Sequence, residues 1–245
     1  MNAVVFGATK GIGRAVAREL AQRGDRLFLF GRHPADLERS ATDLDIRRGQ
    51  SAVAGSAVCN LSDPATFGPA LAAAKSALGE IDLVVVTAGE FATQAALEAD
   101  LSRAHVLLAA NFTNTVLFCE EARRYLLPRG GTLCVFSSVA GERGRKPVII
   151  YGAAKAGLSR YLEGLDHKYR SAGLKVVCVK PGFVKTSMTA GLKPPPFAGT
   201  PEQVARIAVK AIDRGTPVVY APGIWRLVML VIRLLPRAVM RRIEF

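Results

Sequence analysis

The chain has 245 residues, half of them hydrophobic, and a formal net charge of +13. This length and apolar content suit a single large domain with a buried core, and no linker or internal repeat divides it. The charge either serves solubility or attracts an anionic partner, a phosphorylated ligand or a membrane surface; with 7% aromatic residues and no recognised motif, we expect no nucleic-acid partner.

Short apolar runs alternate with helical patterns along the chain. Strands are predicted at 3–6, 27–30, 52–58, 81–86, 132–136, 175–179 and 217–220. The first begins almost at the N-terminus and leaves no room for a signal peptide. Helices are predicted at 12–23, 34–48, 102–127 and 150–171, and two more begin at Asp63-Pro64 and Thr200-Pro201. This alternation predicts an α/β fold: a Rossmann-type doubly wound parallel sheet of about seven strands with helices on both faces.

The four cysteines lie far apart, each in an apolar segment: Cys59, Cys119, Cys134 and Cys178. Their spacing matches neither a zinc site nor a disulfide framework, so we expect reduced thiols and no metal site. Reduced thiols are typical of a cytoplasmic protein.

A glycine-rich turn joins the first predicted strand to the first helix, with its glycines in a G-x-x-x-G-x-G spacing. Glycine permits unusual backbone angles and the close approach of a pyrophosphate, and the helix N-terminus beyond it offers unpaired N–H groups. After the first strand of an α/β chain, such a turn predicts a dinucleotide site formed by Gly7, Thr9, Lys10, Gly11, Ile12 and Gly13.

The charge at the end of the second strand indicates which dinucleotide binds. Arg32 stands where an NAD site usually carries an acidic residue for the ribose 2′-hydroxyl, and an arginine there accommodates a 2′-phosphate. Lys10 adds a second cation, so the sequence favours NADPH (NADP+) as the cofactor. The alternative is that Arg32 is only a solvated surface charge, and the nearby Asp36 weighs against the assignment.

Tyr151 and Lys155 lie four residues apart in a predicted helix and therefore on one face. A free tyrosine titrates near about 10, which is high for a group that must exchange a proton near neutrality. A neighbouring ammonium favours the phenolate, and lowering the pKa to about 7 needs roughly 4 kcal/mol. We expect Lys155 to lower the pKa of Tyr151 in this way, unless the pair is purely structural.

Further motifs follow the predicted strands and the long helix. Thr87-Ala88-Gly89 follows the fourth strand, Ser138 follows the fifth strand thirteen residues before Tyr151, and Asn111 lies in the long helix. A Pro-Gly turn with a threonine, 181–186, follows the sixth strand. In this order the motifs resemble the short-chain dehydrogenase/reductase family over nearly the whole chain.

The resemblance implies a role for each motif. Tyr151 donates a proton to a carbonyl oxygen as hydride arrives from the nicotinamide, and Lys155 lowers the tyrosine pKa and holds the nicotinamide ribose. Ser138 binds the substrate oxygen, and Asn111 positions a water in a relay to Lys155. The blander alternatives are a capping serine, a helix-interior asparagine and a surface lysine. The remaining cofactor contacts implied are Asn60, Leu61, Ala88, Gly89, Tyr151, Lys155, Pro181, Gly182, Val184 and Thr186, beside Arg32.

Two of these positions depart from the family pattern. Thr87 replaces the usual asparagine of the Asn-Ala-Gly motif. Asn60 stands where many members of the family have an aspartate near the adenine, so that contact is expected to be altered.

Two basic regions bear on the substrate. The segment 140–146 places Arg143, Arg145 and Lys146 beside the predicted active site, which suits an anionic substrate unless the loop is merely solvated. A tail at 223–245 follows the catalytic domain at 1–222. Its arginines share one helical face, apolar residues fill the rest, and Pro236 interrupts the pattern. This is typical of a helix on a membrane surface; the alternative is a helix packed on the domain or on a second subunit.

The tail and the residues around Ser138 and Tyr151 resemble a narrower group, the reductases of decaprenylphosphoryl-2-keto-erythro-pentose. That resemblance implies a ketoreductase of cell wall biosynthesis. Its substrate would be a polyprenyl-phosphate-linked keto-sugar, met in the cytoplasm or at the inner face of the plasma membrane, with 187–199 as the substrate lid. The alternatives are a soluble carbonyl or 3-oxoacyl-carrier-protein reductase and a non-catalytic NADP(H)-binding regulator. The wider family implies a homodimer or homotetramer.

Overall fold

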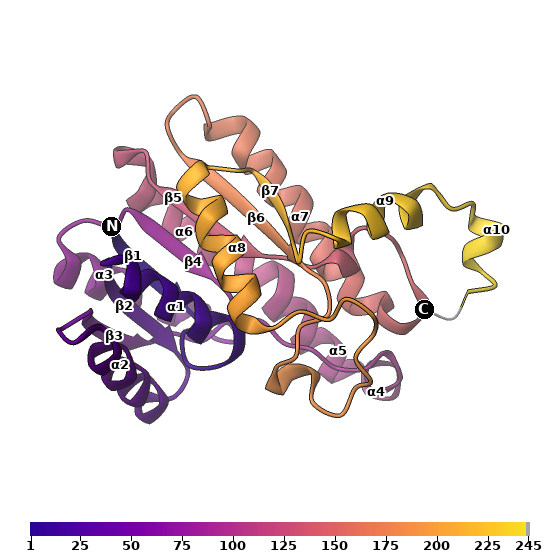
Figure 1. The fold of residues 1–245 in the computed structure, drawn as a ribbon, viewed down its shortest axis with the longest axis horizontal. Helices are drawn as coiled ribbons and strands as arrows, with labels where there is room; N and C mark the ends of the chain where they lie inside the picture. The colour runs from indigo at the N-terminus through magenta and orange to yellow at the C-terminus, as the bar shows by residue number, and fades with distance from the viewer. Residues whose placement is uncertain (244–245) are drawn as a thin grey trace.

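The computed structural model describes residues 1–243, so Glu244 and Phe245 at the end of the predicted tail lie outside the described residues. Within them, seven strands form one parallel sheet in the order β3-β2-β1-β4-β5-β6-β7 (Figure 1). The strands are β1 (Asn2–Phe6), β2 (Arg26–Gly31), β3 (Val53–Val58), β4 (Leu83–Val86), β5 (Thr132–Phe136), β6 (Lys175–Pro181) and β7 (Val218–Ala221). The predicted α/β fold is confirmed.

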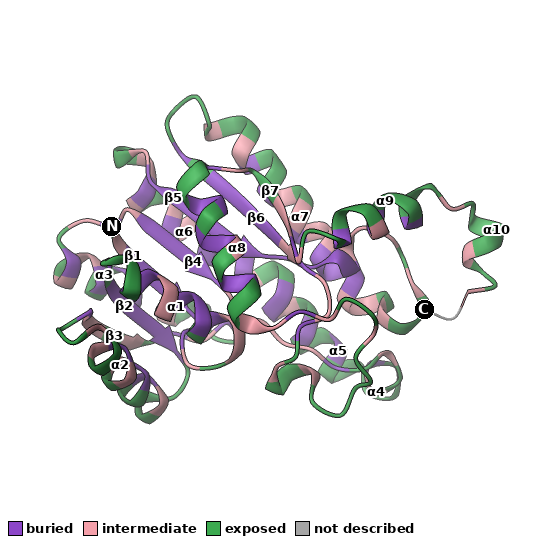
Figure 2. Cartoon of the chain, viewed as in Figure 1, coloured by how far each residue is buried: buried purple, intermediate pink, exposed green. Residues whose placement is uncertain are grey.

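Helices cover both faces of the sheet, and each face has its own hydrophobic core. One face carries α1 (Gly11–Arg23), α2 (Pro34–Arg48) and α8 (Pro201–Arg214). The opposite face carries α3 (Phe67–Leu78), α6 (Asn114–Leu126) and α7 (Ile149–Tyr169). Figure 2 shows the central strands buried between these layers. Strand β4 is apolar at every position because both of its faces are covered.

The long helix predicted at 102–127 is interrupted in the structure. It consists of α5 (Leu101–Leu108), a π-helical turn (Ala109–Thr113) and α6. π-Helical turns are rare and frequently occur at functional sites, and this one contains Asn111. The short helix α4 (Gln94–Ala99) precedes α5 and was not predicted, because six residues give too little periodicity to detect.

The two residues predicted to cap helices, Asp63 and Thr200, both do so in the structure. Thr200 and Gln203 form a reciprocal capping box at the start of α8. Asp63 accepts a hydrogen bond from the backbone of Ala65, but the turn that it caps is a 3-10 turn (Pro64–Thr66) that leads into α3.

The tail forms two helices that extend beyond the sheet, α9 (Trp225–Leu234) and α10 (Arg237–Met240), separated at Pro236 as predicted (Figure 1). One face of α9 is buried on the domain: Trp225, Met229 and Ile232 form a small core with Val139. Packing on the domain, one of the alternatives for the tail, therefore occurs on that face. The other face of α9 is exposed.

All four cysteines are free and buried. No helix in the described range 1–243 combines the length and the apolar character needed to cross a bilayer.

Candidate active site

One cavity of about 920 Å³ opens beyond the carboxyl ends of the strands, where ligands bind in sheets of this kind. The loops after β1, β2, β4, β5 and β6 all contribute to its walls. It is lined by every residue that the sequence assigned to catalysis or to the cofactor, namely Gly7, Thr9, Lys10, Gly11, Ile12, Gly13, Arg32, Asn60, Leu61, Ala88, Gly89, Asn111, Ser138, Tyr151, Lys155, Pro181, Gly182, Val184 and Thr186.

The glycine turn after β1 leaves no space for a side chain at Gly7 or Gly13. Gly7 and Gly11 have φ angles of +93° and +52°, in the region that favours glycine. A Cβ atom on Gly13 would lie 2.1 Å from the carbonyl oxygen of Gly7. Thr87, which replaces the family's asparagine, donates from its hydroxyl to the carbonyl of Phe6 at 2.9 Å and so ties the end of β4 to β1. The turn is a close-fitting cradle that suits a pyrophosphate at the start of α1.

The two cations expected to select the cofactor both lie at this end of the cavity. Lys10 Nζ is 3.6 Å from the carboxylate of Asp36, which also binds Arg39. Asp36 itself does not line the cavity, but its carboxylate stays beside Lys10. Arg32 is 58% exposed and its Nη1 lies 3.3 Å from the carboxylate of Glu90.

The Asn60-Leu61 pair lines the cavity at this end through a local turn. The side-chain oxygen of Asn60 accepts from the backbone of Ser62 at 3.1 Å, and the carbonyl of Leu61 accepts from Asn114 at 2.6 Å. The amide of Asn60 thus fixes its own turn.

Ser138 and Tyr151 come to the cavity from adjoining elements. Ser138 is the N-cap of a 3-10 turn (Val139–Gly141) directly after β5, and its Oγ accepts from the backbone of Ala140 at 3.1 Å. That leaves its hydroxyl hydrogen able to donate to a further oxygen. Tyr151 lies in the first turn of α7, where its ring packs edge-on against Phe91 at a centroid distance of 5.2 Å.

Lys155 and Asn111 are almost fully buried and meet at Gly89. Lys155 Nζ donates to the carbonyl of Phe136 at 3.0 Å. The side chain of Asn111 donates to the carbonyl of Glu90 at 2.8 Å and accepts from its N–H at 3.2 Å. A Cβ on Gly89 would lie 2.8 Å from Asn111 Oδ1 and 3.7 Å from Lys155 Nζ, so both polar groups face the same point. This geometry agrees with a relay between them.

The expected effect of Lys155 on the Tyr151 pKa is not found, and this prediction is wrong for the structure as it stands. Burial raises the pKa of Tyr151 to about 12, although a hydrogen bond with Ser138 acts in the opposite direction. Lys155 Nζ lies 5.9 Å from the centre of the tyrosine ring, and burial lowers the pKa of Lys155 to about 8. Desolvation is the largest cause of both pKa shifts.

The end of the cavity opposite the glycine turn is mainly apolar. It includes residues that were not predicted from the sequence to line a site. Its walls come from the loops beside α4 and α7, the predicted lid and the tail: Phe91, Val139, Val148, Phe183, Met188, Leu192, Pro195 and Trp225. Of the three cations in 140–146, Arg145 lines this cavity, whereas Arg143 and Lys146 line a separate surface pocket. Trp225 belongs to the amphipathic tail, and the sequence pattern there did not predict that it would line a cavity.

The sequence matches the model of the short chain dehydrogenases over residues 1–196. The chain belongs to the short chain dehydrogenase family. It is accordingly an oxidoreductase, and its relatives are named as oxidoreductases and reductases.

Several known proteins are similar to this chain over most of its length. An uncharacterized oxidoreductase of Mycobacterium tuberculosis is 34% identical over 98% of this chain and 95% of that protein. Carbonyl reductase family member 4 of Danio rerio is 32% identical over 78% of each protein. A variant of the actinorhodin polyketide ketoreductase, solved with NADPH, has the same fold, with a TM-score of 0.80 at 22% identity over 90% of this chain and 96% of that one.

Proposed function

We propose that this chain is an NADPH-dependent ketoreductase that reduces a carbonyl group to an alcohol. The observation that carries the proposal is one cavity that joins the glycine turn to Asn111, Ser138, Tyr151 and Lys155. The carbonyl reductase among the relatives and the ketoreductase of similar fold solved with NADPH support it. NADPH, when bound, supplies the hydride.

The side chains of this cavity supply the proton and bind the developing charge. Tyr151 is fully protonated at neutral pH, because burial raises its pKa to about 12, and it donates that proton to the carbonyl oxygen. The hydroxyl of Ser138 donates to the same oxygen where negative charge develops. Lys155, with Asn111 beside it, returns a proton to Tyr151 after each turnover.

The residues at the other end fit NADPH. The glycine cradle receives the pyrophosphate, and Arg32 and Lys10 bind the 2′-phosphate with charge-assisted hydrogen bonds. Affinity for NADPH and NADH, measured by titration, tests this assignment. Equal affinity for the two would contradict it.

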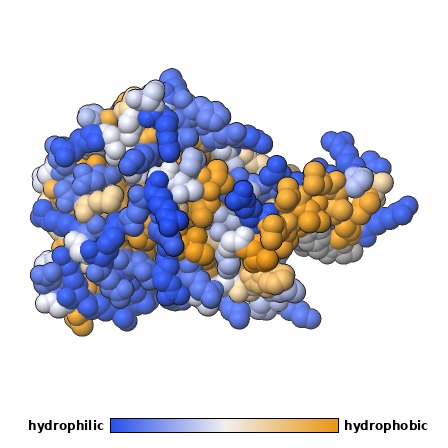
Figure 3. All heavy atoms as spheres, turned by 45° about the horizontal axis from the view of Figure 1, so that its top comes forward, coloured by the Kyte–Doolittle hydropathy of each residue, from blue (hydrophilic) through white to orange (hydrophobic). Residues whose placement is uncertain are grey.

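For the substrate, we propose a ketone linked to an anionic lipid, a polyprenyl-phosphate keto-sugar. Arg145 at the apolar end of the cavity suits a phosphate beside an apolar chain. Figure 3 shows apolar side chains gathered along α9, where Leu227, Val231 and Leu234 are 61%, 61% and 76% exposed. Arginines of the tail flank this apolar face, so that the protein would meet its substrate at the inner face of the plasma membrane, with a role in cell wall biosynthesis.

Binding to anionic vesicles tests the membrane contact. The triple variant Leu227→Gln, Val231→Gln, Leu234→Gln should lose vesicle binding but keep its activity on a water-soluble ketone. Ile46→Gln is the matched control, because Ile46 is 74% exposed on α2, far along the sheet from the tail. Full vesicle binding by the triple variant would show that α9 does not bind lipid.

A second candidate substrate has support from the comparisons. The relatives and fold neighbours include a carbonyl reductase and a polyketide ketoreductase, which favour a soluble carbonyl or a 3-oxoacyl-carrier-protein substrate. Turnover of an acyl-carrier ketone, with none on the lipid-linked keto-sugar, would select this candidate.

We also propose that the protein pairs with itself through α5 and α6, as a homodimer or homotetramer. Large apolar side chains are exposed on α5, on the π-helical turn and on α6: Leu101, Val106, Leu108, Phe112 and Leu117. An isolated chain would leave these side chains in water, and a second copy would bury part of them. Sedimentation of the wild type against Leu117→Glu tests the contact, and a monomeric wild type would contradict it.

A further inference from the structure

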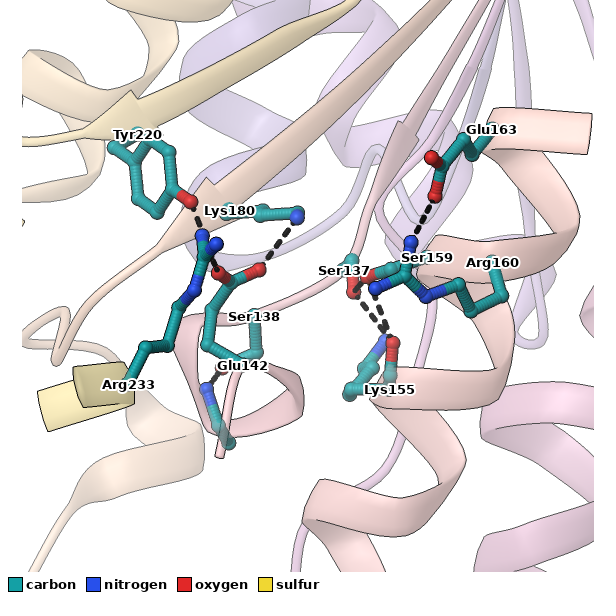
Figure 4. Close-up of polar contacts among 11 residues, drawn as sticks. Ser137, Ser138, Glu142, Lys155, Ser159, Arg160, Glu163, Lys180, Tyr220 and Arg233 are labelled. Carbon is teal, nitrogen blue, oxygen red and sulfur yellow. Dashed lines mark hydrogen bonds and ion pairs between the residues drawn. The ribbon is translucent and has the colours of Figure 1, made fainter. Parts of the chain in front are cut away.

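Glu142 lies at the centre of a polar cluster beside the cavity and joins four parts of the chain (Figure 4). Its carboxylate accepts from Lys180 Nζ at 2.5 Å, from the Tyr220 hydroxyl at 3.0 Å and from Arg233 Nη1 at 3.3 Å. Glu142 ends the 3-10 turn that begins at Ser138, whereas its partners lie on β6, β7 and α9. One side chain thus links the tail to the turn that holds the active-site serine.

The centre of the cluster is charged and almost free of solvent. The side chains of Glu142 and Lys180 are 8% and 12% exposed. Burial opposes the ionisation of Glu142, but hydrogen bonds from Lys180 and Tyr220 and the charge of Arg233 outweigh it and hold the pKa of the carboxyl below its ordinary value. Glu142 is therefore an anion at neutral pH and keeps its cations in place.

Helix α9 carries Trp225 into the wall of the cavity. Trp225 is 7% exposed and donates from Nε1 to the carbonyl of Phe197, in the predicted lid, at 3.3 Å. A Cβ on Gly182 would lie 2.0 Å from this nitrogen, so the indole rests directly on the Pro-Gly turn after β6. At the far end of α9, Arg143 donates to the carbonyl of Leu235 at 2.8 Å.

We propose that Glu142 is a positioning residue that fixes α9 through Arg233, and that Trp225 is thereby a specificity-determining wall of the ketone site. The inference rests on the proposed ketoreductase function. The favoured substrates are ketones with an apolar substituent that can lie against the indole. Glu142 acts on them through α9 and does not line the cavity.

The variant Arg233→Gln tests this inference without altering the cavity, because the Arg233 side chain is 53% exposed and does not line it. We expect the KM for an apolar ketone to rise about fivefold, the effect of one partly exposed ion pair, with kcat and the Kd for NADPH unchanged. Trp225 is the only tryptophan of the chain, so tryptophan emission reports on it alone and should shift to the red as water reaches the indole. The control is Arg226→Gln, an exposed arginine of the same helix.

Two variants of Glu142 test its ion pair with Arg233 from the carboxylate side. Glu142→Gln should raise KM as Arg233→Gln does. The double variant should raise KM no further than either single variant, because both substitutions remove the same contact. Glu142→Asp keeps the charge, so its KM should stay close to the wild-type value. If Glu142→Gln does not fold, Arg233→Gln and the emission of Trp225 decide the question.

Unchanged KM and unchanged emission in Arg233→Gln would overturn the proposal, and so would an equal effect in Arg226→Gln. A purely structural role for Glu142 predicts a lower melting temperature with the wild-type KM. Failure of the ketoreductase proposal gives a different result, since the wild type would then reduce no ketone. The emission shift needs no substrate, and its absence in Arg233→Gln would still show that Glu142 does not fix α9.

Discussion

Replacing Glu142 by glutamine should destabilise the protein well beyond a surface substitution. Glutamine leaves the 12%-exposed ammonium of Lys180 without its anion, and removing one partner of a buried ion pair typically costs about 3–5 kcal/mol. The partial exposure of Arg233 favours the lower end of that range, about 3 kcal/mol. For a chain of this length, that loss lowers the melting temperature by about 6–12 °C.

Thermal and urea denaturation of the wild type and Glu142→Gln measure this difference directly. The matched variant is Glu142→Met with Lys180→Met, which removes both charges and should recover much of the stability, since no buried charge remains unpaired. A loss below about 1 kcal/mol in Glu142→Gln would contradict a buried ion pair between Glu142 and Lys180, because exposed pairs contribute no more than that.

The pH dependence of the same difference follows from the lowered pKa of Glu142. A carboxyl whose pKa is lower in the folded state contributes stability above its unfolded pKa and loses it as the pH falls through the folded pKa. The wild type should therefore lose its advantage over Glu142→Gln in acid and keep all of it at neutral pH. An advantage that persists in strong acid would contradict an ionised Glu142.

Three further predictions concern the cofactor and the proton donor. Arg32→Ala should weaken NADPH binding about tenfold to a hundredfold and leave NADH binding nearly unchanged, as titration would show. Gly13→Ala should abolish NADPH binding while the protein stays folded by circular dichroism, because the added Cβ would lie 2.1 Å from a backbone oxygen of the glycine turn. The rate of ketone reduction should fall as the pH rises through about 8, because Lys155, with its pKa lowered to about 8, then loses its proton; a flat profile from pH 7 to about 9 would exclude that role.

The sheet could be predicted from the sequence because its strands are buried on both faces and therefore appear as short apolar runs, such as Leu83–Val86. The glycine turn and the Tyr151–Lys155 pair were predictable for a similar reason: each depends on local spacing. Local patterns fix which residues reach the carboxyl end of the sheet, and the cavity there contains all of the expected ones.

Properties that depend on packing were not predictable in the same way. Spacing alone suggested that Lys155 lowers the pKa of Tyr151, but desolvation is set by distant segments and raises it. Nothing in the sequence distinguishes the three cations of 140–146. The course of the backbone places Arg145 alone among them in the wall of the main cavity. The role of Trp225 depends on its contact with Gly182, which lies more than forty residues away in sequence.

In the proposed NADPH-dependent reduction of a ketone, Tyr151 donates the proton. The most direct measurement is NADPH oxidation by the wild type and by Tyr151→Phe with one ketone at pH 7. Removal of a general acid predicts a loss in kcat of about a hundredfold to ten-thousandfold, with NADPH affinity retained. Equal rates for the two proteins, or ketone-independent binding of NADPH without turnover in the wild type, would contradict the account.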